Sequence, residues 1–137
     1  MEIQINNSKP VVATLGRLLL ASLFLLSGFG KIADPAGTMG YISSVGLPFP
    51  HLTYAIALAV EIAGGLALVV GFQTRAVALV VAVYSVVAAV AFHRNFADLN
   101  QMVHFLKNIA IAGGLLQVIA FGAGALSIDA RRSSSAK

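Results

Sequence analysis

The chain has 137 residues, of which 58% are hydrophobic and only 10% are charged. A soluble domain is about 45–50% apolar and about a quarter charged, so this composition excludes a soluble enzyme and a disordered chain and indicates an integral membrane protein. The chain contains no cysteine, which excludes disulfides, a thiolate nucleophile and Cys-ligated metal clusters. The net charge of +4 is spread between apolar segments, which argues against nucleic-acid binding and for orientation in a lipid bilayer.

Four apolar runs predict four transmembrane helices, over residues 11–29, 52–72, 76–92 and 102–121. A helix rises about 1.5 Å per residue, so roughly 20 residues cross a hydrocarbon core of about 30 Å. We therefore predict an all-α, up-down bundle over residues 11–122, with a tail at 1–10 and a disordered tail at 123–137. Arg17 interrupts the first run and no small-residue cleavage site follows it, which argues against a cleaved signal peptide.

The Lys and Arg residues of the loops predict the orientation of the bundle. One side would carry Lys9, Arg75, Arg131, Arg132 and Lys137. The other side would carry Lys31 and Arg94, with Lys107 close to it. Because positively charged loops remain in the cytoplasm, we expect both termini to be cytoplasmic.

The first outer loop carries the signals of a short helix of its own. Asp34 is suited to the N-cap, Pro35 to the first helical position, and Gly46 with Pro48 to the stop. We predict an interfacial helix over residues 36–45. Asn100 is the expected cap of the fourth transmembrane helix.

Residues 62–72 and 111–121 are identical at seven of eleven positions and share Gly-Gly-Leu, which suggests a duplicated helical hairpin with parallel repeats. Chance similarity between apolar helices is the alternative. The glycines expected to permit close helix packing are Gly28, Gly64, Gly65, Gly113 and Gly114.

Three ionisable residues lie within the predicted spans, where each is a functional candidate because an unpaired charge is costly there. Glu61 lies about 14 Å from the outer boundary, near mid-membrane. Side chains lean toward the N-terminus of their helix, so we expect Glu61 to pair with Lys107, with Arg17 as a possible second partner. The alternative is that the two cations extend to the interface, or that a buried pair only fixes helix packing.

Polar residues on two helices outline a candidate ligand pocket. Arg17, Gly28 and Lys31 share one face of the first helix, and Asn108 follows Lys107 on the fourth. Glu61, Lys107, Asn108 and nearby aromatic residues would hold the polar head of a quinone or lipid. The histidines at 51, 93 and 104 show no metal-ligand spacing within one helix, so haem or metal binding is not expected.

Several motifs in order along the chain resemble the DoxX family. They are Gly16-Arg17, Ser27-Gly28-x-x-Lys31, Asp34-Pro35, Gly46-Leu47-Pro48, Glu61-x-x-Gly64-Gly65, Gly71-x-x-Thr74-Arg75, His93, Phe105-Leu106-Lys107-Asn108 and Gly113-Gly114. The resemblance covers roughly residues 12–122. It implies a bacterial inner-membrane protein, linked in some relatives to quinone-dependent oxidation or to thiol and oxidative-stress handling. The candidate ligand-binding residues on this basis are Arg17, Lys31, Glu61, His93, Lys107 and Asn108.

Three functions are consistent with this sequence. The first is a quinone- or lipid-binding subunit beside a redox partner protein, without catalysis of its own as an isolated chain. Any redox activity would then belong to a quinone-linked oxidoreductase complex. The alternatives are a structural or assembly protein, and a small proton-coupled transporter that would need to form a homo-oligomer to build a path.

Overall fold

The computed structural model describes residues 8–136 and contains helices without any strand in that range. The helices are α1 (Lys9–Ala33), α2 (Pro35–Ser44), α3 (Pro50–Leu58), the π-helix η1 (Ala59–Gly64), α4 (Gly65–Val70), α5 (Thr74–Phe92), α6 (Leu99–Phe121) and α7 (Ile128–Ser135).

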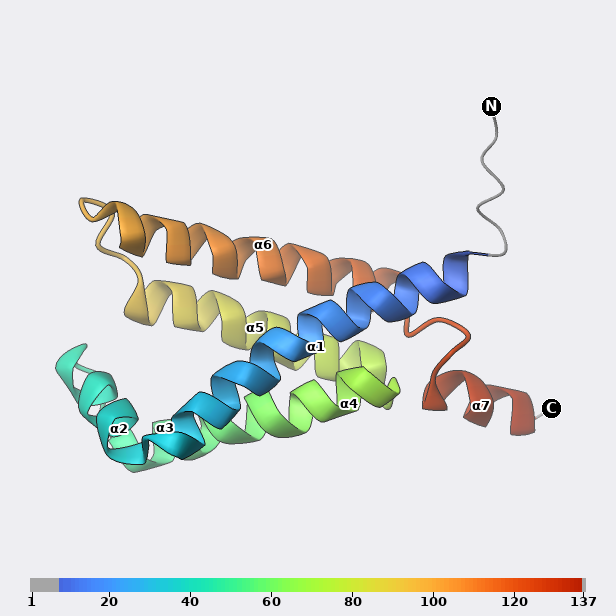
Figure 1. The fold of residues 1–137 in the computed structure, drawn as a ribbon, viewed down its shortest axis with the longest axis horizontal. Helices are drawn as coiled ribbons and strands as arrows, with labels where there is room; N and C mark the ends of the chain where they lie inside the picture. Colours follow the sequence, from blue (N-terminus) through green and yellow to red (C-terminus); the bar gives the residue numbers. More distant parts are fainter. Residues whose placement is uncertain (1–7, 137) are drawn as a thin grey trace.

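Four helical stretches are long and apolar enough to cross a membrane, which confirms the predicted fold class. They are α1, the continuous stretch Pro50–Val70, α5 and α6. Figure 1 shows that α1 begins and α6 ends on the same side, together with α7; we refer to this side as the terminal end. The opposite side, with α2 and the turn between α5 and α6, is the α2 end.

The bundle consists of two helix pairs that meet in a small core. α5 packs along α6, and α1 packs across the stretch from α3 to α4. The fully buried residues where the pairs meet include Ala21, Leu68, Ala78, Val81 and Leu115. Many large apolar side chains remain on the outside, which is expected of helices whose solvent is lipid.

The structure confirms the short helix in the first outer loop and places it at residues 35–44. Asp34 caps it, because the Gly37 N–H donates to Asp34 Oδ1 at 2.9 Å. Tyr41 stacks on Phe92, with 5.5 Å between ring centroids, and so connects α2 to the end of α5. The predicted cap of α6 was wrong: Asp98, not Asn100, is the N-cap, and its side chain accepts from the Asn100 N–H.

The prediction of a disordered C-terminal tail was wrong for residues 128–135, which form α7. Ser127 caps this helix, accepting from the Ala130 N–H at 3.1 Å. Asp129 accepts from the N–H groups of Gln73 and Thr74, both at 2.8 Å, and its own N–H donates to the Gly71 carbonyl. Composition alone indicated disorder because it does not reveal these partners. They lie in and directly after the turn between α4 and α5, far away in the sequence.

The five predicted packing glycines fall into two groups. A Cβ atom at Gly28 would approach Ile62, and one at Gly65 would lie 2.8 Å from Leu25 Cγ, so these two permit close approach of α1 to η1 and α4. Gly64 similarly meets Val81 at 3.0 Å, whereas Gly114 makes ordinary contact and Gly113 meets nothing within 4 Å. Gly113 is therefore not a packing glycine of this bundle.

Candidate functional site

A cavity of about 880 Å³ lies near the α2 end, lined by residues of α1, α2, the loop that follows α2, α3, η1, α5 and α6. We call it the α2-end cavity. Its walls are mostly apolar, and its polar lining includes Lys31, Glu61, Tyr84, His93, Lys107 and Asn108. Five of the six candidate ligand-binding residues therefore line one cavity. Arg17 is the exception.

Several lining residues are also exposed on the outer surface of the bundle. Leu26, Leu52 and Ile56 line the cavity while more than half of each side chain remains accessible. The cavity wall is thus continuous with the surface that faces lipid.

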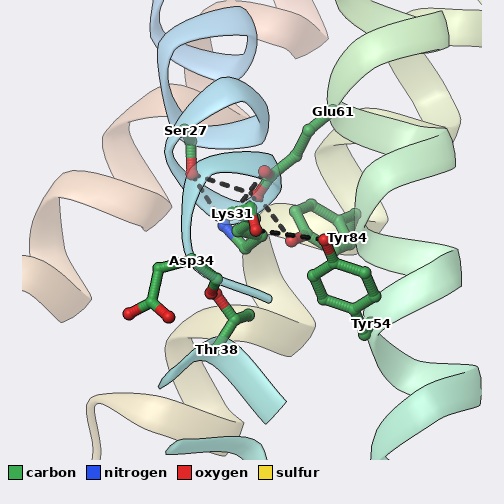
Figure 2. A network of polar contacts seen from close by, with 7 residues as sticks. All are labelled: Ser27, Lys31, Asp34, Thr38, Tyr54, Glu61 and Tyr84. Carbon is green, nitrogen blue, oxygen red and sulfur yellow. Dashed lines mark hydrogen bonds and ion pairs between the residues drawn. The ribbon is translucent and has the colours of Figure 1, made fainter. Parts of the chain in front are cut away.

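The polar centre of the cavity is the carboxylate of Glu61, whose side chain is only 4% exposed. Lys31 Nζ lies 2.9 Å from both Glu61 oxygens. Oε1 also accepts from Tyr84 OH at 2.7 Å and from Ser27 Oγ at 3.2 Å (Figure 2). Lys31 Nζ donates in addition to Ser27 Oγ at 2.8 Å, so all three of its hydrogens have acceptors.

The prediction that Glu61 pairs with Lys107 was wrong, and helix direction gives the reason. α1 continues to Ala33, so Lys31 is the last basic residue of the helix rather than part of a loop. Its side chain leans back toward the N-terminus of α1, into the membrane, while Glu61 on the antiparallel stretch leans toward the α2 end. The two side chains consequently converge.

Glu61 lies within the π-helix η1, a feature that the hydropathy pattern did not indicate. A π segment adds a residue to the turn and changes the direction of the side chains before it relative to those after it; such segments are frequent at functional sites. Here Glu61 contacts Lys31 of α1 and Tyr84 of α5. The next residue, Ile62, packs beside Gly28 of α1.

Three further polar residues of this network were absent from the predicted site. Tyr84 and Ser27 donate to Glu61, and Tyr54 OH donates to the Lys31 carbonyl at 3.0 Å (Figure 2). A tyrosine within an apolar helix is compatible with the bilayer by itself, so only the contacts in the structure mark Tyr54 and Tyr84. Ser27 did carry a signal, because it stands in the motif Ser27-Gly28-x-x-Lys31 and precedes Lys31 by about one helical turn.

Lys107 and Asn108 reach the same cavity from α6 without joining the Glu61 network. Lys107 Nζ lies 3.1 Å from His104 Nδ1. His104 stacks on His93, with 5.1 Å between ring centroids, and His93 Nδ1 lies 2.9 Å from Gln101 Oε1. Within residues 8–136, no three His, Asp or Glu side chains are close enough together to hold a metal ion.

Arg17 has a different environment, at the terminal end of the bundle, where it is 2% exposed. Its guanidinium donates to the Ala123 carbonyl, to Leu126 O at 2.9 Å and to Val69 O at 3.4 Å. Val69 belongs to the last turn of α4, whose carbonyls have no partner within the helix and favour a positive charge. Arg17 therefore attaches the segment before α7 to α1 and α4, and the cavity does not include it.

The chain is similar to two known inner-membrane proteins over most of its length. The model of the DoxX family matches residues 12–94. The inner membrane protein YqjF of Escherichia coli K12 is 42% identical over 121 residues, which are 88% of this chain and 92% of the relative. The inner membrane protein YphA of the same organism is 33% identical over 130 residues, 90% of this chain and 92% of that protein. No solved structure matches the chain.

Proposed function

This chain belongs to the DoxX family and is a multi-pass inner-membrane protein, and from that premise we propose that it binds a membrane-soluble molecule with an apolar body and a compact polar head. Quinones and lipids have this form. The α2-end cavity is the observation that carries the proposal. Its volume of about 880 Å³ is within the usual range of roughly 300–1,000 Å³ for small-molecule sites.

The arrangement of polar groups supports an amphiphilic ligand. The apolar body would lie along lining residues such as Leu26 and Ile56, which continue to the lipid-facing surface. The head would meet Asn108, whose amide both donates and accepts, and Lys107. Because the chain contains no cysteine, we propose that any thiol or redox chemistry at this site belongs to a partner protein.

Photolabelling in nanodiscs tests the proposal with matched variants. A photoreactive quinone analogue and a photoreactive lipid should each be presented to the full chain. Ala88→Phe fills the cavity, whereas Ala120→Phe introduces the same side chain on α6 outside the cavity. We expect the first variant to lose most of the labelling and the second to retain it.

A second matched pair of variants, both on α6, tests the contact with the polar head of the ligand. Asn108→Leu removes an amide from the cavity wall, and Gln117→Leu removes one from the outside of the same helix. Labelling that is unaffected by both Ala88→Phe and Asn108→Leu would contradict ligand binding in this cavity. Native mass spectrometry of the gently solubilised protein would report retained small molecules and redox partner subunits together.

A structural role is the second candidate, favoured by the saturation of the Lys31–Glu61 pair. Both oxygens of Glu61 contact Lys31, and every Lys31 hydrogen has an acceptor within the chain. In this structural role, the pair fixes how α1 packs on η1 and binds no ligand. In that case Lys31 and Glu61 variants would unfold more easily while the photolabelling of folded protein would not change.

A further inference from the structure

The charges on the wall of the α2-end cavity do not balance. Its charged lining residues are Lys31, Glu61 and Lys107. Lys31 and Glu61 neutralise each other at 2.9 Å. Within residues 8–136, no carboxylate lies within salt-bridge distance of Lys107. The cavity thus has one net positive charge.

The contact that Lys107 makes leaves this charge in place. An ammonium group only donates hydrogen bonds, so His104 Nδ1 is the acceptor at 3.1 Å and contributes no negative charge. The ring hydrogen of the neighbouring His93 is assigned in the same way. Gln101 Oε1 only accepts, so His93 Nδ1 carries the hydrogen. Neither imidazole neutralises the ammonium.

Lys107 lies within a predicted span, with its side chain accessible rather than buried in the bundle. It lies five residues after Met102, where the apolar run of this span begins, which is about 8 Å along the helix. A cation at this depth is unfavourable unless it is paired or reaches the interface. Since Asn108 and Lys107 line the same cavity, an anion bound there would receive a charge-assisted hydrogen bond and a neutral one.

We propose that the ligand of the α2-end cavity is an amphiphile with a single anionic head, a carboxylate or a phosphate, held by Lys107 with Asn108 beside it. This inference rests on the proposed function, because it specifies the head group of the same ligand. It favours a fatty acid or an anionic phospholipid over a quinone, whose head is neutral. The apolar chain lies along the wall formed by α1 and α3.

The experiment compares heads of different charge on one alkyl chain. The full chain is placed in phosphatidylcholine nanodiscs and labelled with a photoreactive analogue of dodecanol. Dodecanoate, dodecyl phosphate, dodecanol and dodecylamine then compete with the label. We expect the two anions to displace it at concentrations about tenfold lower than dodecanol, since an anionic head adds charge–charge attraction to the hydrogen bond that the ammonium donates to either head. The relative potency of dodecanoate and dodecyl phosphate distinguishes a fatty acid from a phospholipid as the source.

Variants test whether the preference for anionic competitors depends on the Lys107 side chain. Lys107→Met should remove the preference for anions, and Lys107→Arg should retain it. Arg94→Met is the matched control, because Arg94 is a cation near the same end of the bundle but does not line the cavity. It should also retain the preference.

Each outcome tests a different statement. Equal displacement by dodecanol and dodecanoate would overturn the anionic head while leaving the cavity ligand of the proposed function intact. A preference that survives Lys107→Met, or that disappears with Arg94→Met, would show a surface-charge effect and overturn the role of Lys107. Labelling that no competitor displaces, and that Ala88→Phe does not reduce, would overturn the proposed function itself.

Discussion

At the scale of single residues, the main polar feature of the bundle interior is the Lys31–Glu61 ion pair. Placing two charges in a low-dielectric interior carries a large desolvation cost, which attraction and hydrogen bonds must offset. Here Tyr84 and Ser27 supply additional donors to the carboxylate. We therefore expect removal of one charge of the pair to destabilise the fold more than removal of both.

The first prediction uses that asymmetry. Lys31→Met leaves a buried carboxylate without its counter-ion and should reduce stability by about 3–5 kcal/mol. The double variant Lys31→Met/Glu61→Leu should recover part of this loss, since neither charge remains. Thermal unfolding in a mild detergent measures both. A Lys31→Met protein as stable as wild type would show that the pair contributes nothing to packing.

A second prediction concerns two glycines that the sequence pattern treats as equivalent. Gly65→Ala places a Cβ atom 2.8 Å from Leu25 Cγ, and such overpacking costs about 1–3 kcal/mol. Gly113→Ala meets nothing within 4 Å and should be neutral or slightly stabilising, because alanine favours a helix more than glycine does. Comparison of the two melting temperatures tests this; equal effects would contradict the close packing of α1 on α4.

At the scale of secondary-structure elements, α7 is attached to the bundle by a small set of polar contacts. Asp129 accepts from two N–H groups at the start of α5, where helix geometry leaves donors free, and Arg17 holds the segment before it. The helix has no buried residue of its own. Its position therefore depends on hydrogen bonds more than on apolar packing.

The third prediction follows from this dependence. Asp129→Asn removes the charge that accepts from Gln73 and Thr74, so α7 should detach more often and trypsin should cut faster after Arg131 and Arg132. Ser134→Ala is the control, because its hydroxyl donates only to the Ala130 carbonyl within α7. Equal cleavage rates for the Asp129 variant and the control would contradict the attachment of α7 through Asp129.

The fourth prediction is a pH dependence of the same contact. Burial of Asp129 acts to raise its pKa, but the hydrogen bonds from Thr74 and Gln73 and the charge of Arg132 outweigh it and lower the pKa below the usual value. The folded pKa is thus below the unfolded one of about 3.9, so the contribution to stability is complete above that value and declines as the pH falls through the folded pKa. Hydrogen exchange of α7, corrected for the intrinsic rate, should show unchanged protection from pH 7 to pH 5. Loss of protection already between these values would contradict this assignment.

At the scale of the whole molecule, the orientation in the membrane is the main open prediction. The terminal end carries Lys9, Arg75, Arg131 and Arg132, whereas the α2 end carries fewer cations. The positive-inside rule then predicts that both termini are cytoplasmic and that the α2 end, with its cavity, lies toward the outer leaflet. A ligand would accordingly come from that leaflet.

Because the chain has no cysteine, single cysteines report this orientation directly. Asn95→Cys, in the turn between α5 and α6, should react with a membrane-impermeant maleimide in intact cells. Ser134→Cys, in α7, should react only after the membrane is permeabilised. The reverse pattern would show that the bundle has the opposite orientation, with the α2-end cavity toward the cytoplasmic side.

The sequence by itself determined the four spans, the short helix α2 and the family. These depend on hydropathy over about 20 residues and on capping signals within a few residues, both of which are local. It also identified five of the residues that line the cavity, because an ionisable or amide side chain in an apolar helix is conspicuous. Charge and position along one helix are legible without any knowledge of neighbouring helices.

Only the tertiary structure decided which of these residues meet. Glu61 pairs with Lys31 rather than Lys107, Arg17 lies away from the cavity, and residues 128–135 form a helix. Each outcome depends on how antiparallel helices align, on where η1 alters the register and on partners far away in the chain. Depth along an axis follows from counting residues, but azimuth and pairing between helices arise only when side chains pack in three dimensions.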